Sequence, residues 1–213
     1  MALDKWWPDL RQVFVRQSAT CRTDSHASIQ QTGRRVPVGV GGVVYAVDSP
    51  TVVDAEAVSR MQLRAWLQTY PDADAGIDDE WILEQHGYLD TAEGIALWRD
   101  AIAAAARQPE RYFCRVVRSG TDVVGVLYGR REELVTLGPM YLLDEAKGSG
   151  VAHRLMDDFL GWAGDSPMRL WVTEYNERAI RFYSRYGFVA TDERELWRGR
   201  LLNVRMVRAA RSP

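Results

Sequence analysis

The 213-residue sequence predicts an α/β fold in which one twisted sheet is flanked by helices. Short β-branched and aromatic runs alternate with stretches whose apolar residues recur at helical spacing. Their order is one strand, two or three helices, three strands, a helix, a strand, a helix and two final strands. Because 46% of the residues are hydrophobic, the chain can bury one sizeable core.

The chain is expected to divide into an arm and one folded domain. Residues 1–40 are mostly polar, mixed in charge and without clear periodicity. We therefore expect an N-terminal arm over residues 1–40, loosely attached or poorly ordered, and a folded domain over residues 41–213.

The first half of the domain is predicted to be mainly helical. A β-branched run over residues 43–47 gives the first strand. A helix is expected over residues 54–69, with Asp54 as its candidate cap. One or two more helices are expected between residues 78 and 108, interrupted near Gly87.

The second half is predicted to be mostly strands. Two β-rich runs flank a Ser-Gly-Thr-Asp turn, which is typical of a hairpin. Gly187 ends the last expected helix, because glycine favours the position after a helix C-terminus. The expected strands are 111–117, 123–129, 133–143, 168–175, 188–197 and 201–208, and the expected helices are 150–163 and 176–187.

The composition argues against several classes of function. Lys plus Arg number 27 and Asp plus Glu number 29, a formal charge of −2, so no global basic field is available for nucleic acid. No apolar run is long enough to span a membrane, and the N-terminus lacks the apolar core of a signal peptide. We expect a cytoplasmic protein with no nucleic-acid or membrane partner. Cys21 and Cys114 lack metal-ligand spacing, so no metal site is predicted.

A glycine-rich turn at residues 144–150, DEAKGSG, stands between an expected strand and an expected helix. A helix N-terminus presents unpaired N–H groups and the positive end of the helix dipole. Glycines let the backbone approach an anion closely, and Lys147 adds a positive charge. The turn therefore predicts a pyrophosphate site, although an ordinary turn that needs glycine for its dihedral angles is the alternative.

A second motif makes the pattern specific. Lys147-Gly148-Ser149-Gly150-Val151-Ala152 is followed by Trp171-Val172, Asn176, Ala179, Phe182-Tyr183 and Gly187-Phe188. In this order and spacing, the chain resembles the GCN5-related N-acetyltransferase (GNAT) family over about residues 43–208. The resemblance implies a twisted, mixed, mostly antiparallel sheet of six or seven strands flanked by helices. Its two central strands would run parallel and diverge where acetyl-CoA binds.

The resemblance also implies roles for individual residues. Acetyl-CoA would be the co-substrate, and Asn176 would hydrogen-bond its pantetheine amides. Tyr183 would act as general acid and protonate the leaving CoA thiolate. The implied cofactor-binding residues are Met140, Tyr141, Leu142, Lys147, Gly148, Ser149, Gly150, Val151, Ala152, His153 and Asn176, where His153 contributes its backbone more than its ring.

The general base stays open at this point. Glu132, Glu133, Glu174 and Asp144 are candidates, and deprotonation through water is the alternative. His86 is expected on a helix surface. Ribosomal-protein alanine acetyltransferases within the family carry a catalytic Glu where this chain has Trp171, which argues against that activity.

The acceptor also stays open. The region expected to shape its pocket is rich in aromatic and acidic residues, which would suit a cationic amine. A charged loop with a helix cap is the competing interpretation. The residues concerned are Trp66, Tyr70, Asp72, Asp74, Asp78, Asp79, Glu80 and Trp81.

Three functions remain in view. The first is acetyl transfer to a primary amine of a small molecule, peptide or protein. The second is a non-catalytic acyl-CoA-binding regulatory module on the same fold. The third, a nucleotide-binding protein of another fold, is disfavoured because no Walker lysine is present. A homodimer is compatible with the resemblance, but nothing in the sequence specifies one.

Overall fold

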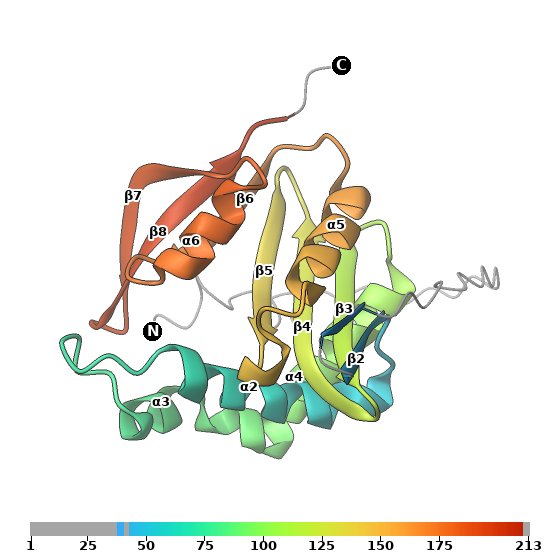
Figure 1. The fold of residues 1–213 in the computed structure, drawn as a ribbon, viewed down its shortest axis with the longest axis horizontal. Coiled ribbons are helices and arrows are strands. Elements are labelled where there is room, and N and C mark those ends of the chain that lie inside the picture. Colours follow the sequence, from blue (N-terminus) through green and yellow to red (C-terminus); the bar gives the residue numbers. More distant parts are fainter. Residues whose placement is uncertain (1–37, 41–42, 211–213) are drawn as a thin grey trace, which may run out of the picture.

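The computed structural model describes residues 38–40 and 43–210. Its strands form one mixed sheet in the order β1-β2-β3-β4-β5-β6-β8-β7 (Figure 1). Every neighbouring pair is antiparallel except β5 and β6. The strands are β1 (Val38–Val40), β2 (Val43–Asp48), β3 (Tyr112–Ser119), β4 (Asp122–Arg131), β5 (Val135–Leu142), β6 (Met168–Thr173), β7 (Val189–Trp197) and β8 (Leu201–Arg208).

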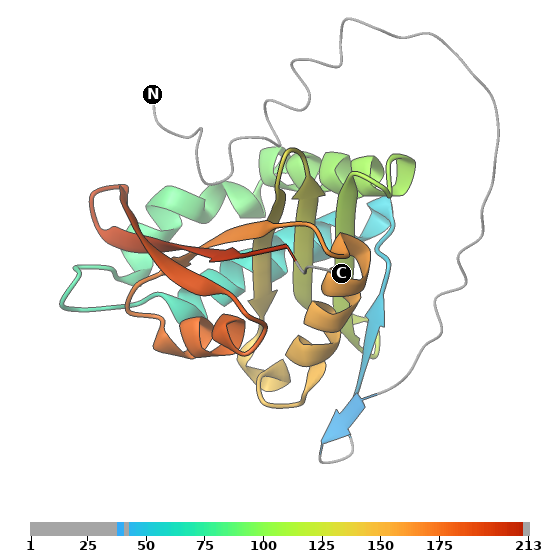
Figure 2. The same cartoon turned by 90° about the horizontal axis from the view of Figure 1, so that it is seen from above.

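Helices cover both faces of the sheet. Figure 2 shows α2 and α4 on one side and α5 on the other. Trp98 of α4 meets Tyr128 edge-on, whereas Phe159 of α5 meets Phe113 edge-on. The helices are α2 (Ala55–Thr69), α3 (Asp79–His86), α4 (Ala92–Arg107), α5 (Val151–Ala163) and α6 (Glu177–Ser184), with 3-10 segments at Val52–Asp54, Gly87–Asp90 and Asp144–Ala146.

The expected architecture is confirmed. Strands β2 to β8 form the mixed, mostly antiparallel sheet, and the three-residue β1 adds one more strand at its edge. Strand β1 falls within the last residues of the predicted arm, and residues 1–37 of that arm lie outside the described residues. The apolar positions Val58, Met61 and Ala65, which recur at helical spacing on one face of α2, are buried.

The predicted cap of α2 is wrong in detail. Asp54 precedes the helix, but its carboxylate makes no capping bond to it. Instead it accepts the backbone N–H of Thr51 at 2.7 Å and pairs with Arg118 at 2.9 Å. These interactions lower the pKa of Asp54 although burial opposes them. Asp54 thus fixes the turn before α2 to strand β3.

Strands β5 and β6 part soon after they meet. Only Val135↔Met168 and Thr136↔Arg169 are paired in the parallel ladder. On its other side β5 pairs with β4, and β6 pairs with β8, so the sheet divides into two halves at this point. A register shift opposite Tyr128 accommodates the extra residue of Gly138-Pro139 and bends β5. The expected divergence of the two parallel strands is therefore present.

Candidate active site

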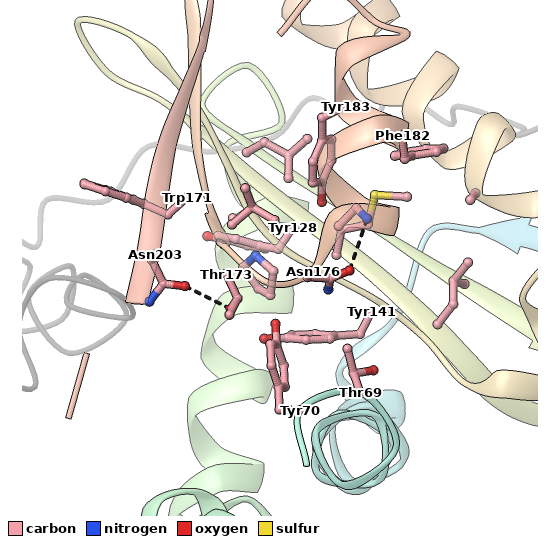
Figure 3. Close-up of a pocket in the computed structure, with 18 of the residues that line it drawn as sticks. Thr69, Tyr70, Tyr128, Tyr141, Trp171, Thr173, Asn176, Phe182, Tyr183 and Asn203 are labelled. Carbon is pink, nitrogen blue, oxygen red and sulfur yellow. Dashed lines mark hydrogen bonds between the residues drawn. The ribbon is translucent and has the colours of Figure 1, made fainter. Parts of the chain in front are cut away.

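A cavity of about 1070 Å³ lies where β5 and β6 diverge. Its walls come from α2, the end of α3, strands β4 to β8, the glycine-rich turn and α6. Figure 3 shows that side chains from both halves of the sheet converge on it, among them Tyr141 of β5 and Thr173 of β6, together with Tyr70, which follows α2, and Tyr183 of α6. The cavity therefore joins the predicted cofactor region to the predicted acceptor region.

The glycine-rich turn has the geometry of an anion cradle. Gly148 and Gly150 line the cavity with φ angles of 82° and 87°, a backbone region that favours glycine. Within the described residues, the N–H groups of Gly148, Gly150 and Ala152 donate to no protein acceptor. They stand at the N-terminus of α5, where the helix dipole favours an anion.

Two residues of the motif have a supporting place instead. Ser149 is buried, donates from Oγ to the Ala146 carbonyl at 2.7 Å, and accepts the Val151 N–H at 3.4 Å. Val151 is fully buried in the core. Neither lines the cavity. Ser149 and Val151 therefore hold the turn in shape.

Lys147 and His153 flank the turn and line the cavity. Lys147 Nζ pairs with Asp144 Oδ1 at 2.6 Å and lies 3.4 Å from Thr69 Oγ1. His153 Nδ1 lies 2.7 Å from the Tyr186 hydroxyl, so its ring is held by α6's C-terminal segment. Both side chains are anchored by neighbours at the rim of the turn.

Met140, Tyr141 and Leu142 form the exposed edge of the split sheet. They pair with Leu127, Val126 and Gly125 of β4 on one side. On the other side the parallel ladder to β6 has already ended at Thr136. Because backbone groups alternate along a strand edge, some N–H and C=O groups of this segment face the gap.

Asn176 connects the gap to α6. Its Oδ1 accepts the Ala179 N–H at 3.1 Å and caps the helix. The side chain lines the cavity (Figure 3). With Oδ1 committed to the cap, the amide NH₂ is the group that can donate to a ligand.

Tyr183 reaches the same cavity from α6, and in Figure 3 its hydroxyl points toward the space near Asn176 and Tyr141. The residue is 8% exposed. Burial raises its pKa, and the nearby Tyr70 phenol raises the pKa further. The phenol therefore keeps its proton throughout the neutral pH range, which a proton donor requires.

The candidate bases lie away from this cavity. Asp144 pairs with Lys147, Glu174 pairs with Arg194 at 2.7 Å, and Glu132 lies 3.7 Å from Arg130. Glu132 and Glu133 border a separate cavity of about 350 Å³. The carboxylate side chain that does line the main cavity is Glu195 of β7, which the sequence analysis did not single out.

The acidic loop between α2 and α3 serves local structure. Asp78 accepts the Trp81 N–H at 2.8 Å and caps α3, and Asp72 accepts two N–H groups of its own turn. None of the five predicted acidic residues lines the cavity, whereas Trp66 and Tyr70 do. The interpretation as a charged loop with a helix cap therefore describes this segment.

The expectation for His86 is wrong. The residue is 7% exposed, lines the cavity, and stacks on Trp66 at 3.8 Å and on Trp197 at 5.2 Å between ring centroids. Neither ring nitrogen has a hydrogen-bond partner in the described part of the chain. Burial lowers its pKa to about 3, with a further contribution from Arg198. A neutral imidazole is thus part of an aromatic wall.

The geometry defines an α/β domain with a glycine-rich turn at a helix N-terminus beside a split sheet, and comparison with known proteins agrees on the fold. Residues 58–188 match the model of the Acetyltransferase (GNAT) family. The chain therefore belongs to the GNAT acetyltransferase family. No curated protein matches the chain.

Solved structures share the fold at low identity. The PaiA N-acetyltransferase from Thermoplasma acidophilum, solved with coenzyme A, is 15% identical with a TM-score of 0.62, over 78% of this chain and 98% of that one. Ard1 from Thermoplasma volcanium is 22% identical with a TM-score of 0.56, over 79% and 99%. The ribosomal-protein-S18-alanine N-acetyltransferase from Escherichia coli is 16% identical with a TM-score of 0.55, over 79% and 96%.

The described residues contain no helix of the length and apolarity that a membrane crossing requires. No group of three or more His, Cys, Asp or Glu side chains in residues 38–40 and 43–210 is arranged to hold a metal ion.

Proposed function

We propose that this protein is an acetyl-CoA-dependent N-acetyltransferase that transfers an acetyl group to a primary amine by direct attack. The observation that carries the proposal is the convergence of the glycine-rich turn, the open edge of β5, Asn176 and Tyr183 on one cavity. Membership of the GNAT family supports it.

The cavity offers a place for each part of acetyl-CoA. The N–H groups of Gly148, Gly150 and Ala152 would bind the pyrophosphate. The edge of Met140 to Leu142 would hydrogen-bond the pantetheine arm as a neighbouring strand would, and the Asn176 amide would donate to it. A backbone N–H of the same edge would stabilise the oxyanion that forms on the thioester carbonyl.

The reaction needs one proton donor near the sulfur. The amine nitrogen attacks the thioester carbonyl carbon, the carbonyl oxygen takes up negative charge, and the C–S bond then breaks. Tyr183 would give its phenolic proton to the departing thiolate, and the amine would lose its proton to water. Burial raises the pKa of Tyr183, which keeps the phenol protonated before the transfer and also makes it a weaker acid than a solvent-exposed tyrosine.

Thermal melting with acetyl-CoA, desulfo-CoA and ATP tests the cofactor site first. A ligand at 100 times its Kd should stabilise the protein by about 2.7 kcal/mol. Stabilisation by both CoA compounds and not by ATP is the expected result. An amine panel, read by thiol release, then tests catalysis. Binding without turnover of any amine would favour the non-catalytic module, and no stabilisation by either CoA compound would refute the cofactor site.

A further inference from the structure

Six arginines line the cavity: Arg178, Arg181 and Arg185 on or just after α6, and three on strands of the sheet. Arg130 lies on β4, Arg169 on β6 and Arg205 on β8. Arg130 pairs with Thr136 across β4 and β5, and Thr136 pairs with Arg169 across β5 and β6. Directly paired residues share a sheet face, so the Cα atoms of Arg130 and Arg169 are about 10 Å apart, two strand spacings.

The three strand arginines lie on the face of the sheet opposite to the glycine-rich turn. Tyr128, two residues before Arg130, points to the α4 face, where it meets Trp98. The turn leads into α5, whose Phe159 packs on the other face. A second substrate that reaches the gap from the α4 side would therefore meet the arginines.

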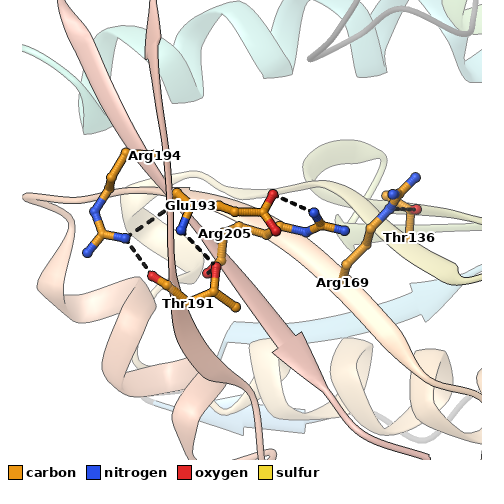
Figure 4. Close-up of polar contacts among 6 residues, drawn as sticks. All are labelled: Thr136, Arg169, Thr191, Glu193, Arg194 and Arg205. Atoms are coloured by element: carbon orange, nitrogen blue, oxygen red, sulfur yellow. Dashed lines mark hydrogen bonds and ion pairs between the residues drawn. The ribbon is translucent and has the colours of Figure 1, made fainter.

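Partners for two of these arginines come from outside the cavity. Arg205 Nη1 lies 2.5 Å from Glu193 Oε2, and Arg130 Nε lies 3.7 Å from Glu132 Oε2. Figure 4 shows the Glu193–Arg205 pair on one side and Arg169 with Thr136 on the other. Two of the three positive charges are thus offset by carboxylates.

Of the three strand arginines, Arg169 is the one whose charge no carboxylate offsets in the described part of the chain. Its Nε donates to Thr136 Oγ1 at 3.0 Å (Figure 4). Within the described residues it makes no ion pair, although Glu132 and Glu133 border a smaller cavity with it. Glu195 does not lie beside Arg169. It is paired with Asn203, and Asn203 with Thr173, which is four residues, about 13 Å, from Arg169 along β6.

The position of Arg169 relates this charge to the reaction. Its pair with Thr136 is the last of the parallel ladder, so Arg169 stands where the gap between β5 and β6 begins. An anionic group bound there would share the gap with the thioester, which would lie beside the Met140–Leu142 edge, about 13 Å or more further along β5.

We propose that the acceptor is a small amine that also carries a carboxylate, and that Arg169 binds this carboxylate. The inference rests on the proposed acetyl transfer and names its substrate class. Among the three strand arginines, Arg169 is the one without a carboxylate partner in the described residues, and its planar guanidinium can hold a carboxylate through two hydrogen bonds. Because Thr136, which is paired with Arg169, lies about 13 Å along β5 from Met140, an acceptor whose carboxylate and amine are several bonds apart fits this span better than an α-amino acid does.

Matched acceptors test the proposal. We would measure kcat/KM for a set of amino acids, each beside its carboxamide and its aminoalkylphosphonate analogue. The carboxylates should exceed the carboxamides by roughly 10- to 100-fold, the range for a hydrogen bond to a charged group. Equal or better turnover of the carboxamides would overturn the proposal, and preference for the phosphonates would replace the carboxylate with a phosphate-like group.

Variants of Arg169 and Arg194 test which residue causes the preference for carboxylates. In Arg169→Gln the preference should fall to less than about threefold, through KM rather than kcat, with acetyl-CoA stabilisation unchanged. Arg169→Lys should keep part of it. Arg194→Gln is the matched control, because Arg194 lies on β7 and pairs with Glu174 outside the cavity. An undiminished preference in Arg169→Gln would refute the assignment to Arg169.

A binding experiment tests the carboxylate site without requiring turnover. N-acetyl amino acids and their carboxamides would be titrated by calorimetry in the presence of CoA. Tighter binding of the acids, lost in Arg169→Gln, supports the carboxylate site even if every acceptor in the panel is slow. Equal binding of acid and carboxamide overturns it. Failure of the proposed acetyl transfer has a different signature, because acetyl-CoA would then not stabilise the protein or would bind without turnover of any amine in the panel.

Discussion

Replacing Gly148 by Ala separates the conformational need of the turn from its role in binding. Gly148 has a φ of 82° and lines the cavity. An added Cβ would meet no atom within 4 Å. Any loss of stability therefore comes from the backbone conformation, since no neighbour has to move.

The expected magnitude follows from the cost of a left-handed conformation. For a residue other than glycine this cost is about 1–2 kcal/mol. In a domain of this size, 1 kcal/mol shifts Tm by about 2–4 °C, so Tm should fall by about 2–8 °C. The new methyl group would also stand in the predicted phosphate cradle, and the Kd for acetyl-CoA should rise by about tenfold or more, which is about 1.4 kcal/mol or more.

Gly161→Ala provides the matched control. Gly161 lies on α5, the helix that the turn opens, and an added Cβ again meets nothing within 4 Å. In a helix interior the same change should stabilise by about 0.5–1 kcal/mol. Urea denaturation and acetyl-CoA titration of both variants give the assay. A Gly148→Ala protein as stable as Gly161→Ala, with unchanged affinity, would refute the reasoning.

Three further predictions concern the site and the core. Tyr183→Phe should lower kcat by about 10²–10⁴-fold and leave stabilisation by acetyl-CoA intact; a smaller loss in steady-state assays would exclude Tyr183 as the general acid. Gly129→Ala should destabilise the fold by about 1–3 kcal/mol in urea, because its Cβ would lie 2.4 Å from Cε2 of the buried Phe159; no change would contradict the packing. The pKa of His86 in the folded protein, about 3, lies below its value near 6.5 in the unfolded chain. The contribution of His86 to the free energy of unfolding should therefore be constant above pH 6.5 and decrease at lower pH, by at most about 1.4 kcal/mol per pH unit. His86→Phe should flatten this profile in denaturation measured from pH 7 to pH 4.

The sequence was informative where local chemistry decides the structure. The left-handed glycines at positions 148 and 150 are required by one turn, and the helix expected from residue 176 begins beside Asn176, whose capping bond was not predicted. The turn and the start of the helix can be identified from spacing alone. The order of strands and helices followed from periodicity in the same way, and the resemblance to the GNAT family supplied the sheet topology.

The wall of the cavity formed by Arg169, Trp171 and Thr173 could not be predicted in the same way. Met168, Leu170 and Val172 are buried on β6, and Arg169, Trp171 and Thr173 alternate with them, so a second face was visible in the sequence. Which strands would place their side chains beside that face depends on the pairing of β6 with β8 and β5. His86 was misplaced for a similar reason, because Trp197, distant in sequence, covers its ring.

The two-pair ladder between β5 and β6 leaves the molecule with a strand edge in its interior. Unpaired edges invite pairing with other chains, and proteins normally shield them. Here the proposed cofactor would act as the missing neighbour, so a dissociable metabolite would complete the sheet. The resistance of this protein to aggregation, and the hydrogen exchange of the amides from Leu137 to Leu142, would then depend on the acetyl-CoA supply of the cell.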